Sequence, residues 1–403
     1  MNILFITPYL PFIPDTGGAI RRKGFLEHLS KEHNVTVVGY YYTESQKNYL
    51  YLVEKICNKL YAIQFDPCKQ LLPATWCGKD IPDISKECVD LGIRDSVAEL
   101  FHFNRYDIIH LEHSYFAIAL PNNIPQERVC IDEHNIESEI YQRQLALSDE
   151  ILEVDKLKVY HNWQVTNSFE ENVWKLYPRC IVTSYRESDI IRNRVPNTNV
   201  VVVPNSVDVD YFYFSDHQFI ERNRIAFVGS LNHIPNLDGI KHFLKNIFPM
   251  ILQGKPDTML YIIGGPIRDD IKSCISELGQ KNNVVLTGYI KDIRPILSGS
   301  RLAIAPIRYG SGTRLKIISA MSMGVPVVTT STGVEGIDLI HGEDILISDD
   351  AEHFAERVLS LLQDDTLWLK LRVNGRNHVV ESYSYSAMGT QIDKAYRSLF
   401  NFY

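Results

Sequence analysis

The chain has 403 residues, which is too long for one ordinary domain and predicts two or three. Its 45% apolar and 22% charged residues are typical of a globular protein, and its net charge of −8 argues against a nucleic-acid-binding protein. The seven scattered cysteines form no CxxC pair, and there is no signal peptide or membrane-spanning apolar run, so we expect a cytoplasmic protein without a disulfide framework or a zinc site.

The first half of the chain alternates short apolar strands with helices. Strands are predicted at residues 3–7, 35–39, 107–111, 128–132, 180–184 and 200–204, and helices at 19–31 and over most of 138–177. The first strand, a loop with two glycines, the first helix and the second strand make a βαβ unit. This order is typical of a parallel sheet.

The same alternation restarts after residues 208–222, where an aromatic run meets a charged stretch. Strands are predicted at 224–229, 259–265, 284–288, 302–305 and 325–328, and amphipathic closing helices at 351–362 and 367–383. We therefore predict an α/β protein with two Rossmann-like parallel-sheet domains facing a cleft, over residues 1–212 and 213–385. Ligands of such sheets bind beyond the carboxyl ends of the strands.

A glycine-rich stretch follows the predicted strand at 302–305 and opens a helix. It contains Gly310, Ser311, Gly312 and Thr313. Glycines let a backbone approach an anion closely, and the first N–H groups of a helix point toward it. Arg314 and Lys316 oppose the helix dipole there unless something negative is bound, so we predict a phosphate site that a diphosphate would fit. The alternative is a glycine-containing turn with two solvated cations, and the P-loop pattern GxxxxGK[ST] is absent.

A second glycine pair, Gly17-Gly18, lies between the first strand and the first helix. It follows Thr16 and lacks the GxGxxG dinucleotide pattern, so it indicates either a phosphate or substrate approach or an ordinary tight turn. Arg21 and Arg22 in the following helix can reach into the cleft or lie exposed on the surface.

Polar residues gather after two neighbouring strands of the first half. They are His110, Glu112 and His113 after one strand, and Asp132, Glu133, His134 and Asn135 after the other. Chemistry is expected at such strand ends, and His134 is the strongest single candidate, against the alternative of a structural or exposed histidine. Asp208-Val209-Asp210 matches a DxD metal pattern but lies at the domain junction, so we interpret it as a hinge and predict no metal site.

In this order the stretches resemble the retaining nucleotide-sugar glycosyltransferases of the GT-B fold, family 4 (glycosyl transferases group 1), over nearly the whole chain. The strongest match is the segment 310–316 with Gly324-Val325-Pro326-Val327-Val328. Supporting matches are residues 227–231 with Pro235-Asn236, 287–289 with Asp292, 204–208, Gly17-Gly18 and 132–135.

The resemblance implies a hexosyltransferase of the EC 2.4 class that retains anomeric configuration and needs neither metal nor cofactor beyond its nucleotide-diphosphate sugar donor. The implied donor-binding residues are Gly17, Gly18, Gly229, Ser230, Gly288, Tyr289, Gly310, Ser311, Gly312, Thr313 and Ser319. The implied catalytic residues are His134, Arg314 and Lys316, and the implied acceptor-side residues are His113, Asn135 and Arg21.

The resemblance also implies a division of labour between the domains. The C-terminal domain would bind the donor, with its base near Gly288 and Tyr289 and its diphosphate at Arg314 and Lys316. The N-terminal domain would hold the hydroxyl acceptor, and a last helix at 386–403 would pack back onto it. No nucleic-acid partner is expected, and membrane contact would be peripheral at most.

Two serines depart from the family pattern. Ser311 and Ser319 stand where the family carries two glutamates, and a serine cannot give a ribose diol the bidentate acceptor that a carboxylate gives. One such contact is worth about 1.5–3 kcal/mol of binding. Ser230 and Asn236 stand where many members have Arg and Lys. Alternatives are therefore a non-catalytic GT-B subunit or glycan-binding partner of a transferase, and a sugar-nucleotide epimerase. Donor, acceptor and oligomeric state stay open.

Overall fold

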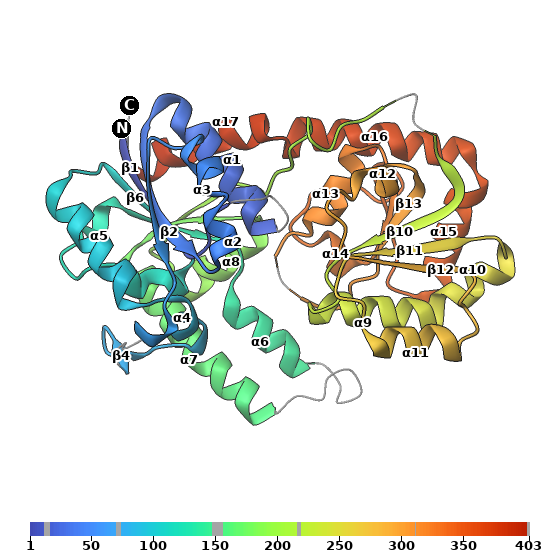
Figure 1. The fold of residues 1–403 in the computed structure, drawn as a ribbon, viewed down its shortest axis with the longest axis horizontal. Coiled ribbons are helices and arrows are strands. Elements are labelled where there is room, and N and C mark those ends of the chain that lie inside the picture. The colour runs from blue at the N-terminus through green and yellow to red at the C-terminus, as the bar shows by residue number, and fades with distance from the viewer. Residues whose placement is uncertain (12–16, 70–73, 147–155, 216–218, 311, 401–403) are drawn as a thin grey trace. The chain divides into compact units, whose positions relative to one another are not determined.

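A computed structural model of the chain describes residues 1–11, 17–69, 74–146, 156–215, 219–310 and 312–400 (Figure 1). The chain divides into two compact units. Unit 1 comprises Met1–Asn205 together with Met388–Tyr403, and unit 2 comprises Ser206–Ala387. The first division lies somewhat earlier in the chain than the predicted boundary at 212. Each unit is described by itself below.

Unit 1 is built on a parallel sheet with the strand order β3-β2-β1-β6-β7-β8-β9. Its strands are β1 (Asn2–Thr7), β2 (Asn34–Tyr41), β3 (Lys59–Gln64), β6 (Ile108–Glu112), β7 (Val129–Glu133), β8 (Arg179–Val182) and β9 (Asn199–Val202), and a small antiparallel pair is β4 (Thr75–Trp76) and β5 (Lys79–Asp80). Its helices are α1 (Gly17–Glu32), α2 (Glu44–Lys47), α3 (Leu50–Glu54), α4 (Asp83–Cys88), α5 (Leu91–Phe103), α6 (Glu137–Ala146), α7 (Lys156–Leu176) and α8 (Tyr185–Arg194). Short 3₁₀ turns are η1 (Pro67–Lys69), η2 (Ser114–Ala119) and η3 (Gln126–Arg128).

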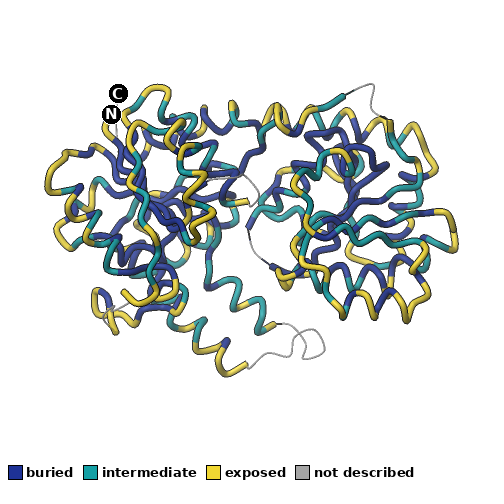
Figure 2. The backbone as a smooth tube through the Cα atoms, in the orientation of Figure 1, coloured by how far each residue is buried: buried dark blue, intermediate teal, exposed yellow. Residues whose placement is uncertain are grey.

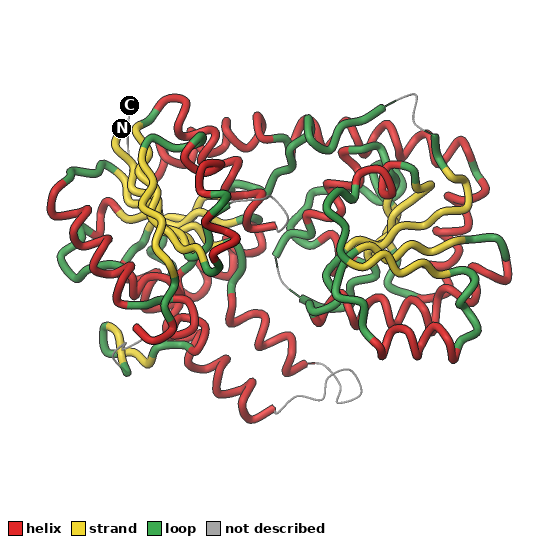
Figure 3. The backbone as a smooth tube through the Cα atoms, viewed as in Figure 1, coloured by secondary structure: helices red, strands yellow, loops and turns green. Residues whose placement is uncertain are grey.

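The central strands of unit 1 are covered on both faces by helices (Figure 3). After its first residue, β1 is buried throughout, and β6 and β7 are buried along their whole length. Figure 2 shows the same contrast, with buried strands and helices exposed on their outer sides. Strands buried on both faces need continuous apolar runs rather than alternation, which explains the pattern of these segments.

Unit 2 repeats the architecture with a parallel sheet in the order β12-β11-β10-β13-β14-β15. Its strands are β10 (Glu221–Val228), β11 (Met259–Ile263), β12 (Val284–Gly288), β13 (Ser300–Ala305), β14 (Val327–Thr329) and β15 (Leu346–Ile347). Its helices are α9 (Ile234–His242), the π-helical turn η4 (Phe243–Ile247), α10 (Phe248–Gly254), α11 (Asp269–Glu277), α12 (Arg294–Ser298), α13 (Leu315–Ser322), α14 (Ser331–Val334), α15 (Ala351–Gln363) and α16 (Asp365–Tyr383).

Helix starts in both units carry side-chain caps. Asp90 begins α5, Ser184 begins α8, Asp350 begins α15 and Asp364 begins α16, and in each case the side chain accepts a hydrogen bond from a backbone N–H of the first turn. These caps satisfy N–H groups that have no partner inside the helix.

The last helix, α17 (Tyr385–Phe400), belongs to unit 1 from Met388 onward. It lies beside α1 (Figure 1), where His28 Nε2 is 2.8 Å from Asp393 Oδ1. Arg179 also donates to the backbone carbonyl of Leu399 at 2.8 Å. A segment from the end of the chain thus completes the unit with which the chain begins.

The prediction of two parallel-sheet α/β domains is confirmed. Among the described residues, no helix is long and apolar enough to cross a membrane. One local expectation differs, because Gly17 and Gly18 lie in the first turn of α1 rather than in the loop before it. Thr16, named with them, lies outside the described residues.

Candidate functional site

The first group of predicted residues lies at the carboxyl ends of β6 and β7. The two strands pair in parallel, and their register places Glu112 opposite Asp132 at the last step of the ladder. His113 and His134 come directly after these carboxylates, so four polar side chains meet at one edge of the sheet. Glu112 and Asp132 are each about 1% exposed or less.

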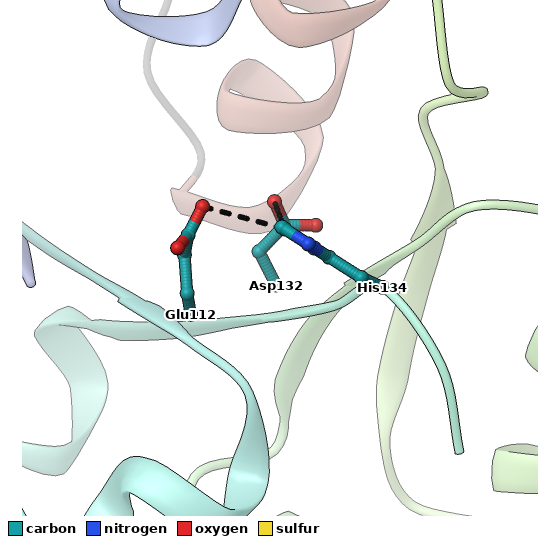
Figure 4. A group of neighbouring side chains, drawn as sticks. All are labelled: Glu112, Asp132 and His134. Carbon is teal, nitrogen blue, oxygen red and sulfur yellow. Dashed lines mark ion pairs between the residues drawn. The ribbon is translucent and has the colours of Figure 1, made fainter. Parts of the chain in front are cut away.

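His134 lies between the two carboxylates (Figure 4). Its Nε2 is 3.3 Å from Glu112 Oε1 and 3.3 Å from Asp132 Oδ2. Burial alone would lower the pKa of His134, but Glu112 and then Asp132 outweigh it, and the pKa is raised. The site therefore favours a positively charged imidazolium clamped by two negative groups.

Two buried arginines from α1 hold these carboxylates from the other side. Arg21 forms a bidentate pair with Asp132, at 2.7 Å and 3.1 Å, and Arg22 pairs with Glu112. Burial would raise the pKa of Glu112, but Arg22 and His134 lower it to about 2, and Arg21 first among the charges holds the pKa of Asp132 well below its usual range. Both carboxylates are therefore ionised at neutral pH.

Arg21 is completely buried and also donates to the Val203 carbonyl at 2.8 Å and to Asn205 Oδ1 at 3.1 Å. Arg21 contacts the edge of the sheet through Asp132. It is neither exposed nor part of an open surface. His113 is buried too, and its ring stacks on Tyr115 with centroids 4.6 Å apart. Asn135 is half-buried.

Glu112, Asp132 and His134 are also the described residues whose ligand atoms could hold a metal ion, all within 4.8 Å of one another. Sequence reasoning treats them one by one and does not predict the trio. Arg21 and Arg22 already neutralise both carboxylates, so a divalent ion would add two further positive charges to a buried, balanced cluster. The charges fit an imidazolium better than a metal.

The second group of predicted residues lies in unit 2, at the carboxyl ends of β10 and β13, which pair in parallel. Lys316 in the first turn of α13 donates to Asn236 Oδ1 at 2.5 Å, and Asn236 Nδ2 donates to the Ser230 carbonyl at 3.0 Å. A Cβ added at Gly229 would lie 2.7 Å from Asn236 Nδ2 and 3.0 Å from Lys316 Nζ. A side chain at 229 would therefore have to displace the ends of Asn236 and Lys316.

The ammonium of Lys316 sits 5.0 Å above the Phe227 ring. Burial, and then the charge of Arg314, lower the pKa of Lys316 to about 7. His233 lies beside these two cations, because partial burial, followed by Lys316 and Arg314, lowers its pKa, and its ring is therefore mostly neutral at pH 7. His233 escapes sequence-based prediction, although its place between Ser230 and Asn236 in the loop after β10 marks it as part of the same edge.

The glycine-rich stretch approaches this edge from β13. Gly310 and Gly312 have φ angles of 124° and 76°, which favour glycine, and Arg314 stands at the N-cap of α13. Arg314 donates to the Gly312 carbonyl, which fixes the turn before the helix. Ser311 lies outside the described residues. Thr313 is half-buried, whereas Ser319 is only 5% exposed, on the buried side of α13.

The loops after β11 and β12 adjoin the loop after β10. Gly264 donates its N–H to the Gly288 carbonyl at 3.2 Å, and a Cβ at Gly264 would lie 2.3 Å from the Gly229 carbonyl oxygen. Tyr289 follows with its side chain 73% exposed. The predicted glycines and cations of unit 2 that the structure describes thus gather at one edge, with Lys316 and Asn236 in direct contact. The predicted unit 1 residues form a separate group in their own unit.

Part of unit 2 matches a known protein family. Residues 222–364 match the family model described as Glycosyl transferases group 1. Over its whole length the chain is similar to an uncharacterized 44.6 kDa protein in the cps region of Klebsiella pneumoniae, with 23% identity over 98% of this chain and 99% of the relative.

Two solved structures resemble the whole chain. One is Anabaena HepE in complex with UDP-glucose, with 15% identity, 99% of this chain and 100% of that chain covered, and a TM-score of 0.67. The other is a variant of S. aureus TarM in complex with fondaparinux, α-GlcNAc-glycerol and UDP, with 13% identity, full coverage of both chains and a TM-score of 0.69. These likenesses establish the GT-B fold, and with the family match they support a glycosyltransferase.

Proposed function

We propose that the protein is a retaining glycosyltransferase that moves a hexose from a nucleotide-diphosphate sugar to an acceptor hydroxyl, without a metal ion. The observation that carries this proposal is the placement of Arg314 and Lys316 at the start of α13, beside His233. Such a concentration of positive charge at a helix N-terminus is favourable only with an anion in place.

A leaving diphosphate supplies that anion. As the glycosidic bond to the donor phosphate breaks, negative charge grows on the diphosphate, and fixed cations and N–H groups stabilise it. Lys316 is already oriented by Asn236, so little reorganisation is needed at that moment. This is the electrostatic role that a metal ion would otherwise fill.

On the acceptor side, the proposal uses His134. Its Nε2 lies against Glu112 and Asp132, and it is the member of the buried cluster with the most exposure, at 7%. An imidazolium at this edge can donate a hydrogen bond to a sugar hydroxyl and fix its orientation.

The test is a donor panel with purified protein. Transfer or donor hydrolysis is measured for UDP-, GDP-, ADP- and dTDP-hexoses, with and without EDTA, and UDP-glucose comes first because a neighbouring structure contains it. We expect turnover that EDTA leaves unchanged and that Arg314→Ala and Lys316→Ala each reduce by about 10²–10³-fold. Turnover that survives both substitutions contradicts the site assignment.

A second candidate is a non-catalytic GT-B subunit that binds glycan or a partner transferase. It is favoured by Ser319, because this buried serine stands where a ribose-binding carboxylate is expected. Calorimetry separates the two: the subunit binds none of the nucleotides or nucleotide sugars of the panel, whereas the enzyme binds at least one.

A further inference from the structure

A tyrosine of the last helix contacts the first polar group. Tyr396 on α17 places its hydroxyl 2.9 Å from His110 Nδ1, although 286 residues separate the two in sequence. The other ring nitrogen of His110, Nε2, lies 3.5 Å from Asp132 Oδ2. Asp132 is the carboxylate that also holds Arg21 and His134. A continuous line of polar atoms therefore runs from α17 to His134.

Every member of this line is enclosed by protein. His110 is completely buried, Tyr396 is 2% exposed and Asp132 is 1% exposed. The His110 ring stacks on Phe5, with centroids 4.4 Å apart and planes 12° apart, and Phe25 lies 5.3 Å away. The two phenylalanines restrict rotation of the ring, so its nitrogens stay directed at Tyr396 and Asp132.

The partners fix the direction of the hydrogen bonds. Burial raises the pKa of Tyr396 well above its usual value, so the hydroxyl keeps its proton. Asp132 is ionised and can only accept. A proton on His110 Nε2 therefore faces the Asp132 carboxylate, while Nδ1 lies within hydrogen-bond distance of the Tyr396 hydroxyl.

We infer that Tyr396 and His110 are positioning residues of the His134 group: the hydroxyl of α17 holds the His110 ring at Nδ1, and the ring in turn places its Nε2 against Asp132 beside His134. The edge of the unit 1 sheet is then incomplete without the last helix. The charged and titratable groups that face His134 are Glu112, Asp132, Arg21, Arg22 and His113. Tyr396 acts on this set through Asp132.

The experiment follows His134 and His110 by NMR in full-length protein labelled at histidine. A His134→Gln sample identifies the His134 signals, and nitrogen shifts of the His110 ring report its tautomer. In Tyr396→Phe, Nδ1 of His110 loses its hydrogen-bond partner, so we expect its nitrogen shift to change and the ring to hold Nε2 less firmly against Asp132. Asp132 then loses part of a hydrogen-bond donor and its charge acts more strongly on His134, so the pKa of His134 rises by about 0.4–1 pH unit.

Asp393→Asn is the matched control. This substitution weakens another polar contact of α17 with unit 1, the one between Asp393 and His28. That contact is not part of the line of polar atoms that reaches Asp132. We expect this variant to lower the unfolding temperature about as much as Tyr396→Phe and to leave the His134 titration unchanged. An unchanged His134 titration in Tyr396→Phe, or an equal shift in both variants, overturns the inference.

Any effect of the Tyr396–His110–Asp132 contacts on catalysis rests on the proposed function, whereas the expected change in the His134 titration does not. With a donor in hand, Tyr396→Phe should lower kcat and leave donor binding unchanged, because the donor cations lie in unit 2. If the protein transfers no sugar, but Tyr396→Phe changes the His110 nitrogen shifts and the pKa of His134, the result contradicts the proposed function alone. A protein that transfers sugar without those changes contradicts the positioning role alone.

Discussion

Under the proposed function, the charge of Lys316 depends on whether the diphosphate is bound. Its pKa of about 7 in the free protein means that much of it is neutral at pH 8, because burial and Arg314 disfavour the ammonium. A bound diphosphate reverses this balance by placing negative charge against Nζ. Binding above neutral pH must therefore be accompanied by uptake of a proton.

We predict that the dissociation constant for UDP, or for the nucleoside diphosphate that binds best in the panel, rises by up to about tenfold per pH unit above about pH 7.5. The free site loses its proton in this range, so each further unit adds to the cost of charging Lys316. Calorimetry in two buffers of different ionisation heat measures the proton uptake. Lys316→Arg keeps its charge throughout and should bind with a nearly flat pH profile; a slope equal to the wild type would contradict the assignment.

The site residues that could be identified from the sequence are those that lie close together in the chain. Arg314 and Lys316 are two positions apart at a helix start, so their shared location follows from the pattern alone. The contact of Lys316 with Asn236 spans two elements, and the one between Tyr396 and His110 spans almost the whole chain. Neither leaves a signal in the local pattern, because each depends on how separate elements pack.

At the scale of elements, α9 determines how the cationic edge of unit 2 is assembled. Gly239 lies in this helix, and a Cβ there would stand 2.3 Å from the carbonyl oxygen of Pro306, in the loop that leads to the glycine-rich stretch. Asn236 is three residues earlier on the same helix. The absence of a side chain at 239 is what allows α9 to place Asn236 against Lys316.

Gly239→Ala should therefore destabilise unit 2 by about 1–3 kcal/mol and weaken nucleotide binding at the same time. Gly254→Ala in α10 is a suitable comparison, because its Cβ would meet only the mobile end of Leu359 at 2.8 Å. Alanine is also the better helix former, so this variant should be nearly neutral. Urea unfolding and calorimetry check both effects, and equal losses in the two variants would argue against the close approach at 239.

The elements predicted from sequence are those with long apolar runs. β1, β6, β7 and β13 are central and almost wholly buried, and β10 is buried where its apolar pattern is clearest, over Ile225, Ala226 and Phe227. β3 is an edge strand with alternating exposed and half-buried residues, and β15 has only two residues. Neither strand is predicted, because each has too few buried apolar residues to give a clear pattern in the sequence.

At the scale of the whole molecule, buried acids give the stability an unusual pH dependence. Glu133 accepts from Trp174 Nε1 at 2.8 Å, and burial, followed by the neighbouring Glu170, raises its pKa to about 7. The folded protein thus holds a proton that the unfolded chain loses near its usual pKa. At a pH between the pKa of Glu133 in the unfolded chain and its pKa in the folded protein, the folded state binds more protons than the unfolded state. The free energy of unfolding therefore falls as the pH rises.

We predict that the free energy of unfolding declines from about pH 5 to pH 7, by up to about 1.4 kcal/mol per pH unit from this group. Glu133→Gln mimics the protonated carboxyl, so its stability should be close to that of the wild type at pH 5 and exceed it at pH 8. Thermal unfolding across this range measures the difference. Glu99→Gln, at an exposed position of α5, keeps Glu133 and should therefore follow the wild type at both pH values.

The return of the chain to unit 1 has a consequence for how the protein is made. A ribosome releases the strands of this sheet before unit 2, but α17 emerges only after unit 2. Domains generally fold as units during synthesis, N-terminal first. Here the N-terminal unit must wait, since His110 can meet Tyr396 only after unit 2 has been made. The first unit to begin folding is therefore the last to be finished.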